Sequence, residues 1–195
     1  MEKYEWKNMK GDKMYLTEPT PEFLPSVQSV LKKYGKNNTG FQVIRSVQRL
    51  LEADKNGFDA YFTKCFNESK GINLRSEHVP QTTYWLMDET QFVGVVALRH
   101  QLNEALKLMG GHMAYEICPP FRGRGYATTG LKLGLQKAAE LGLEKVLLTC
   151  REENIASYKT MKKVMAEYGG EEQEPVFAHD HINKRVWINT QKQRR

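Results

Sequence analysis

Six consecutive residues are the most informative stretch of this chain: Arg122-Gly123-Arg124-Gly125-Tyr126-Ala127. Gly123 and Gly125 have no Cβ atom, so the backbone can turn sharply there and direct successive N–H groups inward. The periodic apolar residues that follow predict a helix, whose first N–H groups lack acceptors and whose positive dipole end points at the same loop. These features predict a backbone site for an anion such as a pyrophosphate.

Two other kinds of glycine-rich loop are excluded by residue type. A P-loop has Lys and then Ser or Thr after its last glycine, whereas Tyr126 follows Gly125. A dinucleotide-binding fingerprint needs glycine or alanine where Thr128 stands, and it belongs near the first strand of an alternating array. A glycine-rich turn that binds nothing remains an open alternative.

The segments around this loop predict a strand–helix–strand unit. The first strand, 113–118, ends at two prolines, which cannot donate to a sheet ladder. In the helix that ends near Gly142, the apolar residues share one face, and these polar residues lie away from it: Lys132, Gln136, Lys137 and Glu140. The apolar run 146–149 is typical of a strand buried on both faces, and a right-handed crossover would place it parallel to the first strand.

The remaining segments predict an α/β protein of the α+β type. Apolar spacing predicts a mainly helical region from Val27 to Phe66, followed by a loop over 71–81. Asn154 caps a further helix, which stops at Gly169-Gly170. Further strands are expected at 14–17, in a hairpin of 82–87 and 92–99 with a connector at 101–111 after it, and as a final pair around 179–184.

Bulk properties limit the protein class. A chain of 195 residues can form one domain with a sizeable core, and we expect a single domain, 1–195. With 40% hydrophobic and 27% charged residues, and no apolar run near the roughly 20 residues of a membrane span, it is typical of globular proteins. The first residues lack the apolar core of a secretory signal, which favours the cytoplasm. Three widely spaced cysteines indicate neither a disulfide framework nor a zinc site.

The glycine loop resembles the signature of the GNAT superfamily of N-acetyltransferases, Arg or Gln-x-x-Gly-x-Gly or Ala, at Arg122, Gly125 and Ala127. The resemblance covers about 82–188 and includes Asn154-Ile155-Ala156-Ser157. Three neighbouring stretches, Pro80 to Trp85, Leu98 to Asn103 and Gly110 to His112, look like a branch of predicted bacterial acetyltransferases with no defined substrate. The resemblance implies an acyl-CoA N-acyltransferase fold with a central mixed, splayed sheet flanked by helices, in which about 1–80 lies on the acceptor side and about 82–190 forms the sheet and CoA-binding region.

The resemblance also implies how acetyl-CoA, the cosubstrate, is held. In GNAT enzymes the backbone of the strand before the glycine loop pairs with the pantetheine arm, which assigns Ile117 and Cys118. The helix after the next strand reaches the pantetheine or phosphate region through Asn154 and Ser157. The residues implied for the pyrophosphate are Arg122, Gly123, Arg124, Gly125, Tyr126, Ala127 and Thr128.

Acetylation of a lysine-like amine requires loss of a proton, so we expect a base or a water chain leading to one. His112 is the first candidate because its ordinary pKa near 6.5 suits proton transfer, although a histidine that only caps the loop or packs is at least as compatible with the sequence. Glu116 lies at even spacing from His112, hence on the same face of the strand, and could serve instead. A solvated carboxylate is its simpler interpretation. His100 is a third, weaker candidate.

The proton donor to CoA sulfur is less clear. Many GNAT enzymes have a tyrosine for this task where this chain has Met161, and a thioether has no proton to donate. Tyr158, one turn earlier on the same helix face, could substitute, although its spacing is also that of a core residue. A thiol with an ordinary pKa near 8.5 is a tolerable leaving group without an acid.

We therefore expect an enzyme that moves an acetyl group directly from acetyl-CoA to a primary amine, either a small molecule or a peptide. The alternative is a catalytically weak acyl-CoA-binding or regulatory module on the same fold. No nucleic-acid or membrane partner and no metal are expected, since His179 and His181 are interpreted as a solvated turn, and a homodimer is compatible with the sequence. Glutamates after the last helix, at 167, 171, 172 and 174, could attract a cationic amine.

Overall fold

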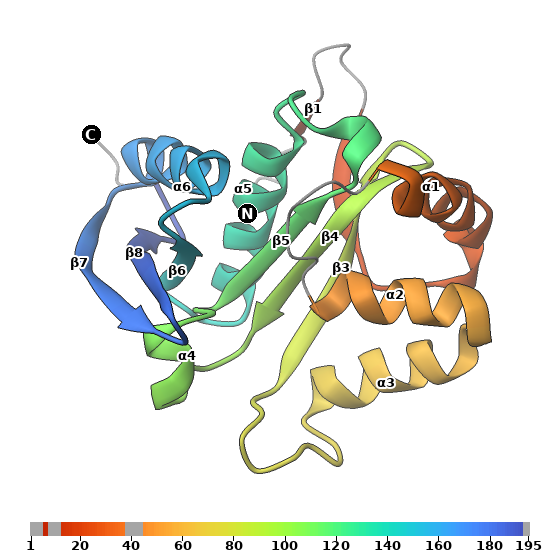
Figure 1. Ribbon diagram of the computed structural model, residues 1–195, viewed down its shortest axis with the longest axis horizontal. Helices are drawn as coiled ribbons and strands as arrows, with labels where there is room; N and C mark the ends of the chain where they lie inside the picture. Colours follow the sequence, from red (N-terminus) through yellow and green to blue (C-terminus); the bar gives the residue numbers. More distant parts are fainter. Residues whose placement is uncertain (1–5, 8–12, 38–44, 193–195) are drawn as a thin grey trace.

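The computed structural model describes residues 6–7, 13–37 and 45–192, which form two antiparallel sheets with helices on their faces (Figure 1). Within these residues the larger sheet has the order β1-β2-β3-β4-β5 and the smaller has β6-β8-β7. The strands are β1 (Trp6–Lys7), β2 (Lys13–Thr17), β3 (Gln81–Asp88), β4 (Gln91–Arg99), β5 (Met113–Ile117), β6 (Lys145–Arg151), β7 (Gly170–Ala178) and β8 (His181–Asn189). The helices are α1 (Leu24–Asn37), α2 (Arg45–Asn56), α3 (Asp59–Lys70), α4 (Glu104–Leu108), α5 (Tyr126–Glu140) and α6 (Ile155–Tyr168). Short 3₁₀ turns occupy Pro21–Phe23 and Pro119–Phe121.

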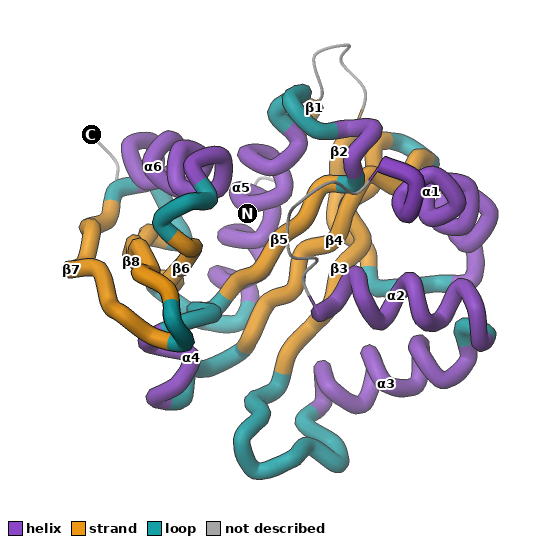
Figure 2. The backbone as a smooth tube through the Cα atoms, viewed as in Figure 1, coloured by secondary structure: helices purple, strands orange, loops and turns teal. Residues whose placement is uncertain are grey.

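The hairpin of β3 and β4, which the sequence predicted, lies at the centre of the molecule. Its strands pair from Gln81↔Arg99 to Asp88↔Gln91, and all residues of 82–87 and 92–98 are buried. Side chains alternate between the two faces: Trp85 and Val95 pack against α1, α2 and α3, whereas Val96 and Leu98 pack against α5 and α6. Figure 2 shows these two helical layers on either side of the larger sheet.

The two sheets meet where β5 begins. The backbone N–H of His112 donates to the Leu147 carbonyl at 2.7 Å, and the N–H of Gly110 donates to Oγ1 of Thr149 at 2.7 Å. Beyond this point β6 pairs with β8 rather than with β5. β5 and β6 therefore form no ladder with each other: the strands meet at one end only, in keeping with the splayed sheet that the resemblance implies, and an edge of β5 lies outside any ladder in the described structure.

Three local expectations need correction. The connector at 101–111 contains helix α4, because the Asn103 side chain accepts the N–H of Leu106 at 2.9 Å and starts a turn. Lys132 is buried rather than turned outward, because α6 covers that side of α5 and supplies Glu167 as its ion-pair partner. The last strand pair is longer than expected, since β7 begins at Gly170, directly after α6.

Candidate functional site

The glycine loop ends one strand and opens one helix. Gly123 and Gly125 have φ values of +78° and +84°, which residues with a Cβ rarely adopt, and Gly125 is the N-cap of α5. The first helical bond runs from Thr129 N–H to the Gly125 carbonyl at 3.1 Å. The N–H groups of residues 126–128 thus have no acceptor within the helix. A Cβ added at either glycine would meet no heavy atom within 4 Å, so the space in front of the loop is open.

Two side chains of this loop face the protein rather than the open space. Nε of Arg122 donates to the Ile117 carbonyl at 3.0 Å, which ties the loop back to β5. Tyr126 is buried against Phe121, and its hydroxyl donates to the Asp88 carboxylate at the end of β3. Arg122 and Tyr126 therefore shape the loop, and its backbone is the part that can bind an anion.

The backbone N–H and C=O groups of β5 point alternately to the edge that pairs with β4 and to the opposite edge. The N–H of Cys118 donates to the Val93 carbonyl at 2.9 Å, and the Cys118 carbonyl accepts from Phe121 N–H at 2.9 Å, so both groups of Cys118 are used. Because successive backbone groups point to opposite edges of a strand, those of Ile117 and Tyr115 face the edge that β6 leaves uncovered. This geometry fits the backbone N–H of Ile117 as a partner for an extended ligand, while the Ile117 carbonyl already accepts from Arg122. It does not fit Cys118, whose backbone was also assigned to the pantetheine arm.

The first turn of α6 borders the same edge. The Asn154 side-chain oxygen accepts the N–H of Ser157 at 3.1 Å, which makes Asn154 the N-cap that the sequence predicted. The Ser157 hydroxyl lies 3.0 Å from the hydroxyl of Tyr115 on β5. The uncovered edge of β5 is thus connected to the glycine loop through Arg122 and to the capped start of α6 through Tyr115.

A family model described as an acetyltransferase (GNAT) domain matches residues 41–167 of this sequence. The chain belongs to the GNAT acetyltransferase family. It is an N-acetyltransferase by this membership, and the expected family and fold class are confirmed. A search of curated proteins finds no significant match.

Solved structures with this fold include several acetyltransferases. Mycobacterium smegmatis RimJ in complex with CoA-disulfide has a TM-score of 0.63 at 14% identity, over 91% of this chain and 82% of that chain. A spermidine N-acetyltransferase SpeG chimera from Vibrio cholerae and hSSAT has a TM-score of 0.54 at 17% identity, over 91% and 95%. The microcin self-immunity acetyltransferase MccE, in complex with acetyl-CoA and AMP, has a TM-score of 0.58 at 11% identity, over 90% and 92%. At such identities the likeness shows the fold.

His112 lies at the junction of the two sheets. Its ring is buried, and its Nδ1 accepts the N–H of Leu147 at 2.9 Å, so a neutral ring carries its proton on Nε2. Burial lowers the pKa of His112 to about 4, and the nearby Arg99 guanidinium adds to the shift. A group with this pKa and an occupied Nδ1 is a weak base at neutral pH, so the geometry favours a role in joining the sheets.

Glu116 faces the α1–α3 side of the larger sheet, because it pairs in register with Val95. Its side chain is 10% exposed, and an oxygen lies 3.4 Å from Nη2 of Arg122. Glu116 thus places a carboxylate near the end of β5, beside the glycine loop. It is better placed to act as a base than His112. His100 lies apart, with Nε2 bonded to Oγ1 of Thr82 at 2.8 Å, and burial lowers the pKa of its ring.

Two residues of α6 bear on the question of a proton donor to the CoA sulfur: Met161, at the usual tyrosine position, and Tyr158. They differ in burial. Met161 is 1% exposed and belongs to the core beneath the helix. The Tyr158 hydroxyl donates to Glu172 of β7, and this bond raises the pKa of the phenol, which makes it a poorer acid. Tyr115, which the sequence analysis did not consider, lies one residue before Glu116 in β5 and therefore on the opposite face of the strand.

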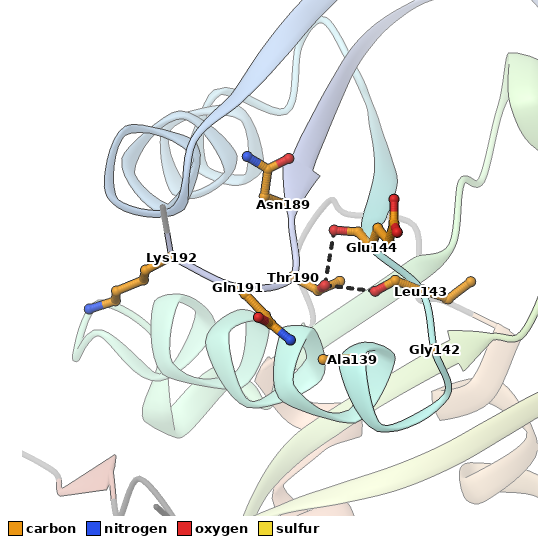
Figure 3. Close-up of a pocket in the computed structure, with 8 residues that line it drawn as sticks. All are labelled: Ala139, Gly142, Leu143, Glu144, Asn189, Thr190, Gln191 and Lys192. Carbon is orange, nitrogen blue, oxygen red and sulfur yellow. Dashed lines mark hydrogen bonds between the residues drawn. The ribbon is translucent and has the colours of Figure 1, made fainter. Parts of the chain in front are cut away.

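One hollow of the described structure lies away from the glycine loop. It measures about 500 Å³ and is lined by residues at the far end of α5 and the end of β8: Ala139, Gly142, Leu143, Glu144, Asn189, Thr190, Gln191 and Lys192 (Figure 3). Since a helix rises 1.5 Å per residue, this hollow is about 20 Å along α5 from the glycine loop. Over the described ranges, no helix is suited to crossing a membrane, and no three His, Cys, Asp or Glu side chains gather as metal ligands.

Proposed function

We propose that this protein moves an acetyl group directly from acetyl-CoA to a primary amine. The observation that carries the proposal is the open backbone cradle at Gly123 and Gly125, which lies next to the uncovered edge of β5. Helix starts attract anions because their N–H groups and dipole both favour negative charge. A pyrophosphate with an extended amide-containing arm matches both features together.

The residues divide between the two parts of acetyl-CoA. The backbone of 122–128 would hold the pyrophosphate, with Arg124 on the exposed side of the loop. The backbone of Ile117 would pair with the amides of the pantetheine arm, as a strand is added to a sheet edge. Asn154 shapes the first turn of α6 by accepting the N–H of Ser157, and this turn would lie beside the same arm.

The acceptor amine would enter from the α1–α3 side, where Glu116 lies. A carboxylate there can accept a hydrogen bond from the attacking amine or from a water that carries its proton away. In this proposal the region 1–80 determines specificity within a single domain, 1–195. Two of the glutamates expected to attract the amine are already paired, Glu167 with Lys192 at 2.7 Å and Glu172 with Lys162 at 2.6 Å, which weakens that role.

The panel of acceptors follows from the chemistry of the structural neighbours. Their names include a spermidine N-acetyltransferase and a ribosomal-protein α-N-acetyltransferase, so polyamines and peptide amino termini are tested first, with free amino acids after them. We place the activity in the cytoplasm. The alternative, a weakly catalytic acyl-CoA-binding module, is favoured by one observation, the buried Met161 at the usual tyrosine position.

Calorimetry with acetyl-CoA, followed by thiol release across the panel, tests the proposal. Gly125→Glu should abolish acetyl-CoA binding because it adds a carboxylate and a Cβ to the cradle. Gly142→Glu is a matched control, since Gly142 also has a positive φ, +82°, and open space around it, at the other end of α5. Equal loss of affinity in both variants would contradict the cradle. Binding by the wild type without turnover on any amine would favour the module.

A further inference from the structure

We propose that the acceptor side of this protein binds an anionic group, so that the acetylated amine belongs to a molecule that also carries a carboxylate or a phosphate. The anion would bind between Arg99 of β4 and Arg45 of α2. The inference rests on the proposed function and deepens it, because it names the class of acceptor: an acidic amine rather than a polyamine.

Arg99 is a partly buried cation with no acidic partner in the described structure. By strand alternation its side chain leaves β4 on the face that carries Val95, which is the α1–α3 side of the larger sheet. Its Nη1 donates to the carbonyls of Gly110 at 3.0 Å and Gly111 at 2.9 Å, which fixes the guanidinium at the junction of the sheets. Its Nε and Nη2 bond no described residue. These two donors share one edge of the guanidinium, as a bidentate contact with a carboxylate or phosphate requires.

A second guanidinium lies close to Arg99. Arg45 begins α2, and α2 packs on β4 (Figure 1). Burial lowers the pKa of Arg99 and the charge of Arg45 lowers it further, so the two cations repel each other. Arg45 is exposed, and no carboxylate of the described residues pairs with it. An anion between the two arginines would remove this repulsion and accept charge-assisted hydrogen bonds from both.

Arg49, one turn further along α2, shows how an arginine of this region is neutralised by the protein itself. Its Nη1 donates to the Glu68 carboxylate of α3 at 2.8 Å, and the two side chains are only 20% and 12% exposed. Positions 45 and 49 lie on one face of α2, because residues four apart are neighbours on a helix. The same helix face therefore carries one arginine that is paired with a carboxylate and one that faces a second arginine.

The strand register gives the distance from this cation pair to the amine. The N–H of Arg99 donates to the His112 carbonyl at 2.7 Å, so Arg99 lies level with His112. Glu116, which is proposed to receive the amine, is four residues further along β5, about 13 Å at roughly 3.3 Å per residue. Ala114 lies between them on the same face and is partly exposed. Because the arginine side chain covers part of this distance, the amine and the anion of the acceptor would be roughly 10 Å apart.

Triglycine is the first probe, because three extended residues span about 10 Å and end in a carboxylate. Its amide has the same length without the charge, and spermidine has a cation in place of the anion. In assays of thiol release from acetyl-CoA, kcat/KM for triglycine should exceed that for the amide about tenfold or more, and spermidine should be slowest. Comparison with 6-aminohexyl phosphate identifies the anion: the faster of the two acids shows whether the site prefers phosphate or carboxylate. Equal kcat/KM for triglycine and its amide would overturn the proposal.

Arg45→Gln tests the site itself. It should reduce the preference for triglycine over its amide to about threefold or less. Lys55→Gln is the matched control, since it removes an exposed cation from the last turn of the same helix, about 15 Å away, and should keep the wild-type preference. An unchanged preference in Arg45→Gln, or an equal reduction in both variants, would show that these arginines do not form an anion site. Arg99→Gln should also remove the preference, and its thermal unfolding is measured because it loses two backbone contacts.

A binding measurement separates this proposal from the proposed function. N-acetyltriglycine carries the carboxylate and has no reactive amine, so calorimetry with it and with its amide requires no acetyl transfer. The wild type should bind the acid about tenfold more tightly than the amide, and Arg45→Gln should bind both about equally. Equal affinity in the wild type would overturn the anion site and leave the acetyltransferase intact. Tighter binding of the acid, without thiol release on any amine, would support the anion site and contradict the proposed function.

Discussion

The two ends of β5 use glycine for opposite purposes. At its start, a Cβ on Gly111 would collide with the Leu147 carbonyl oxygen, so glycine permits the backbones of two sheets to touch. After its end, a Cβ on Gly123 or Gly125 would meet nothing within 4 Å, so glycine there provides the backbone turn and leaves room for a ligand. A glycine that permits contact and a glycine that leaves space look alike in sequence and differ only in what surrounds them.

We call the start of β5, where the two sheets touch, its closed end, and the region around the glycine loop its open end. The closed end is also held by polar contacts. Nη1 of Arg99 donates to the carbonyls of Gly110 at 3.0 Å and Gly111 at 2.9 Å, and His112 bonds Leu147 through both its backbone N–H and its ring. At the open end, the Tyr126 hydroxyl donates a hydrogen bond to the Asp88 carboxylate and holds the start of α5 to the end of β3. The glycine loop beside it faces outward. One end thus determines where the sheets separate, and the other leaves an open space beside the glycine loop.

The largest expected effect is at the closed end. Gly111→Ala should lower the free energy of unfolding by roughly 4 kcal/mol, from overpacking against Leu147 and from a left-handed backbone, φ +58°. Gly125→Ala should lower it by only about 1 kcal/mol, since it has the strain without the collision. Denaturant titration of both variants measures the difference. Similar losses of unfolding free energy in the two variants would contradict the proposed difference between the two ends of β5.

The second effect is a pH dependence carried by His112. Its folded-state pKa of about 4 lies below the ordinary value of 6.5, so the unfolded chain binds the extra proton first. The stabilisation is complete above about pH 6.5 and is lost as the pH falls toward 4, in total roughly 3 kcal/mol. His112→Asn keeps an acceptor near Leu147 and should remove this part of the dependence. Urea denaturation at pH 7.5, 5.5 and 4.5 measures it.

The exposed His179, in the turn between β7 and β8, provides the control for this measurement. His179→Asn should reproduce the wild-type profile between pH 7.5 and 4.5. If the His112→Asn profile also matches the wild type, the histidine does not carry the dependence, and the closed end is held by its backbone contacts alone.

The smallest effect is at the open end. Tyr126→Phe removes the hydroxyl that bonds Asp88 and should weaken acetyl-CoA binding severalfold, about 1 kcal/mol, because the start of α5 is less firmly held. Calorimetry gives the affinity and thermal unfolding gives the stability. Unchanged affinity with reduced stability would show that the loop keeps its shape without this anchor.

Local features were predictable where they depend on neighbours in the chain. The turn at Gly123 and Gly125, the cap at Asn154 and the β3–β4 hairpin follow from residue types and spacing over a few positions, and all three are present. Even spacing also placed His112 and Glu116 on one face of β5. It could not show that the His112 ring turns to Leu147, because that contact joins residues 35 positions apart.

The sequence alone determined the family, the glycine turn at the start of α5 and the strand that leads to it, since glycines, prolines and apolar periods act on the nearby backbone. Tertiary structure decided which edge of β5 is left uncovered, which backbone groups of Ile117 and Cys118 face it, and that Tyr115 rather than a residue of α6 partners Ser157 across 42 positions. Those outcomes depend on the angle at which two sheets meet, and close packing between distant segments sets that angle.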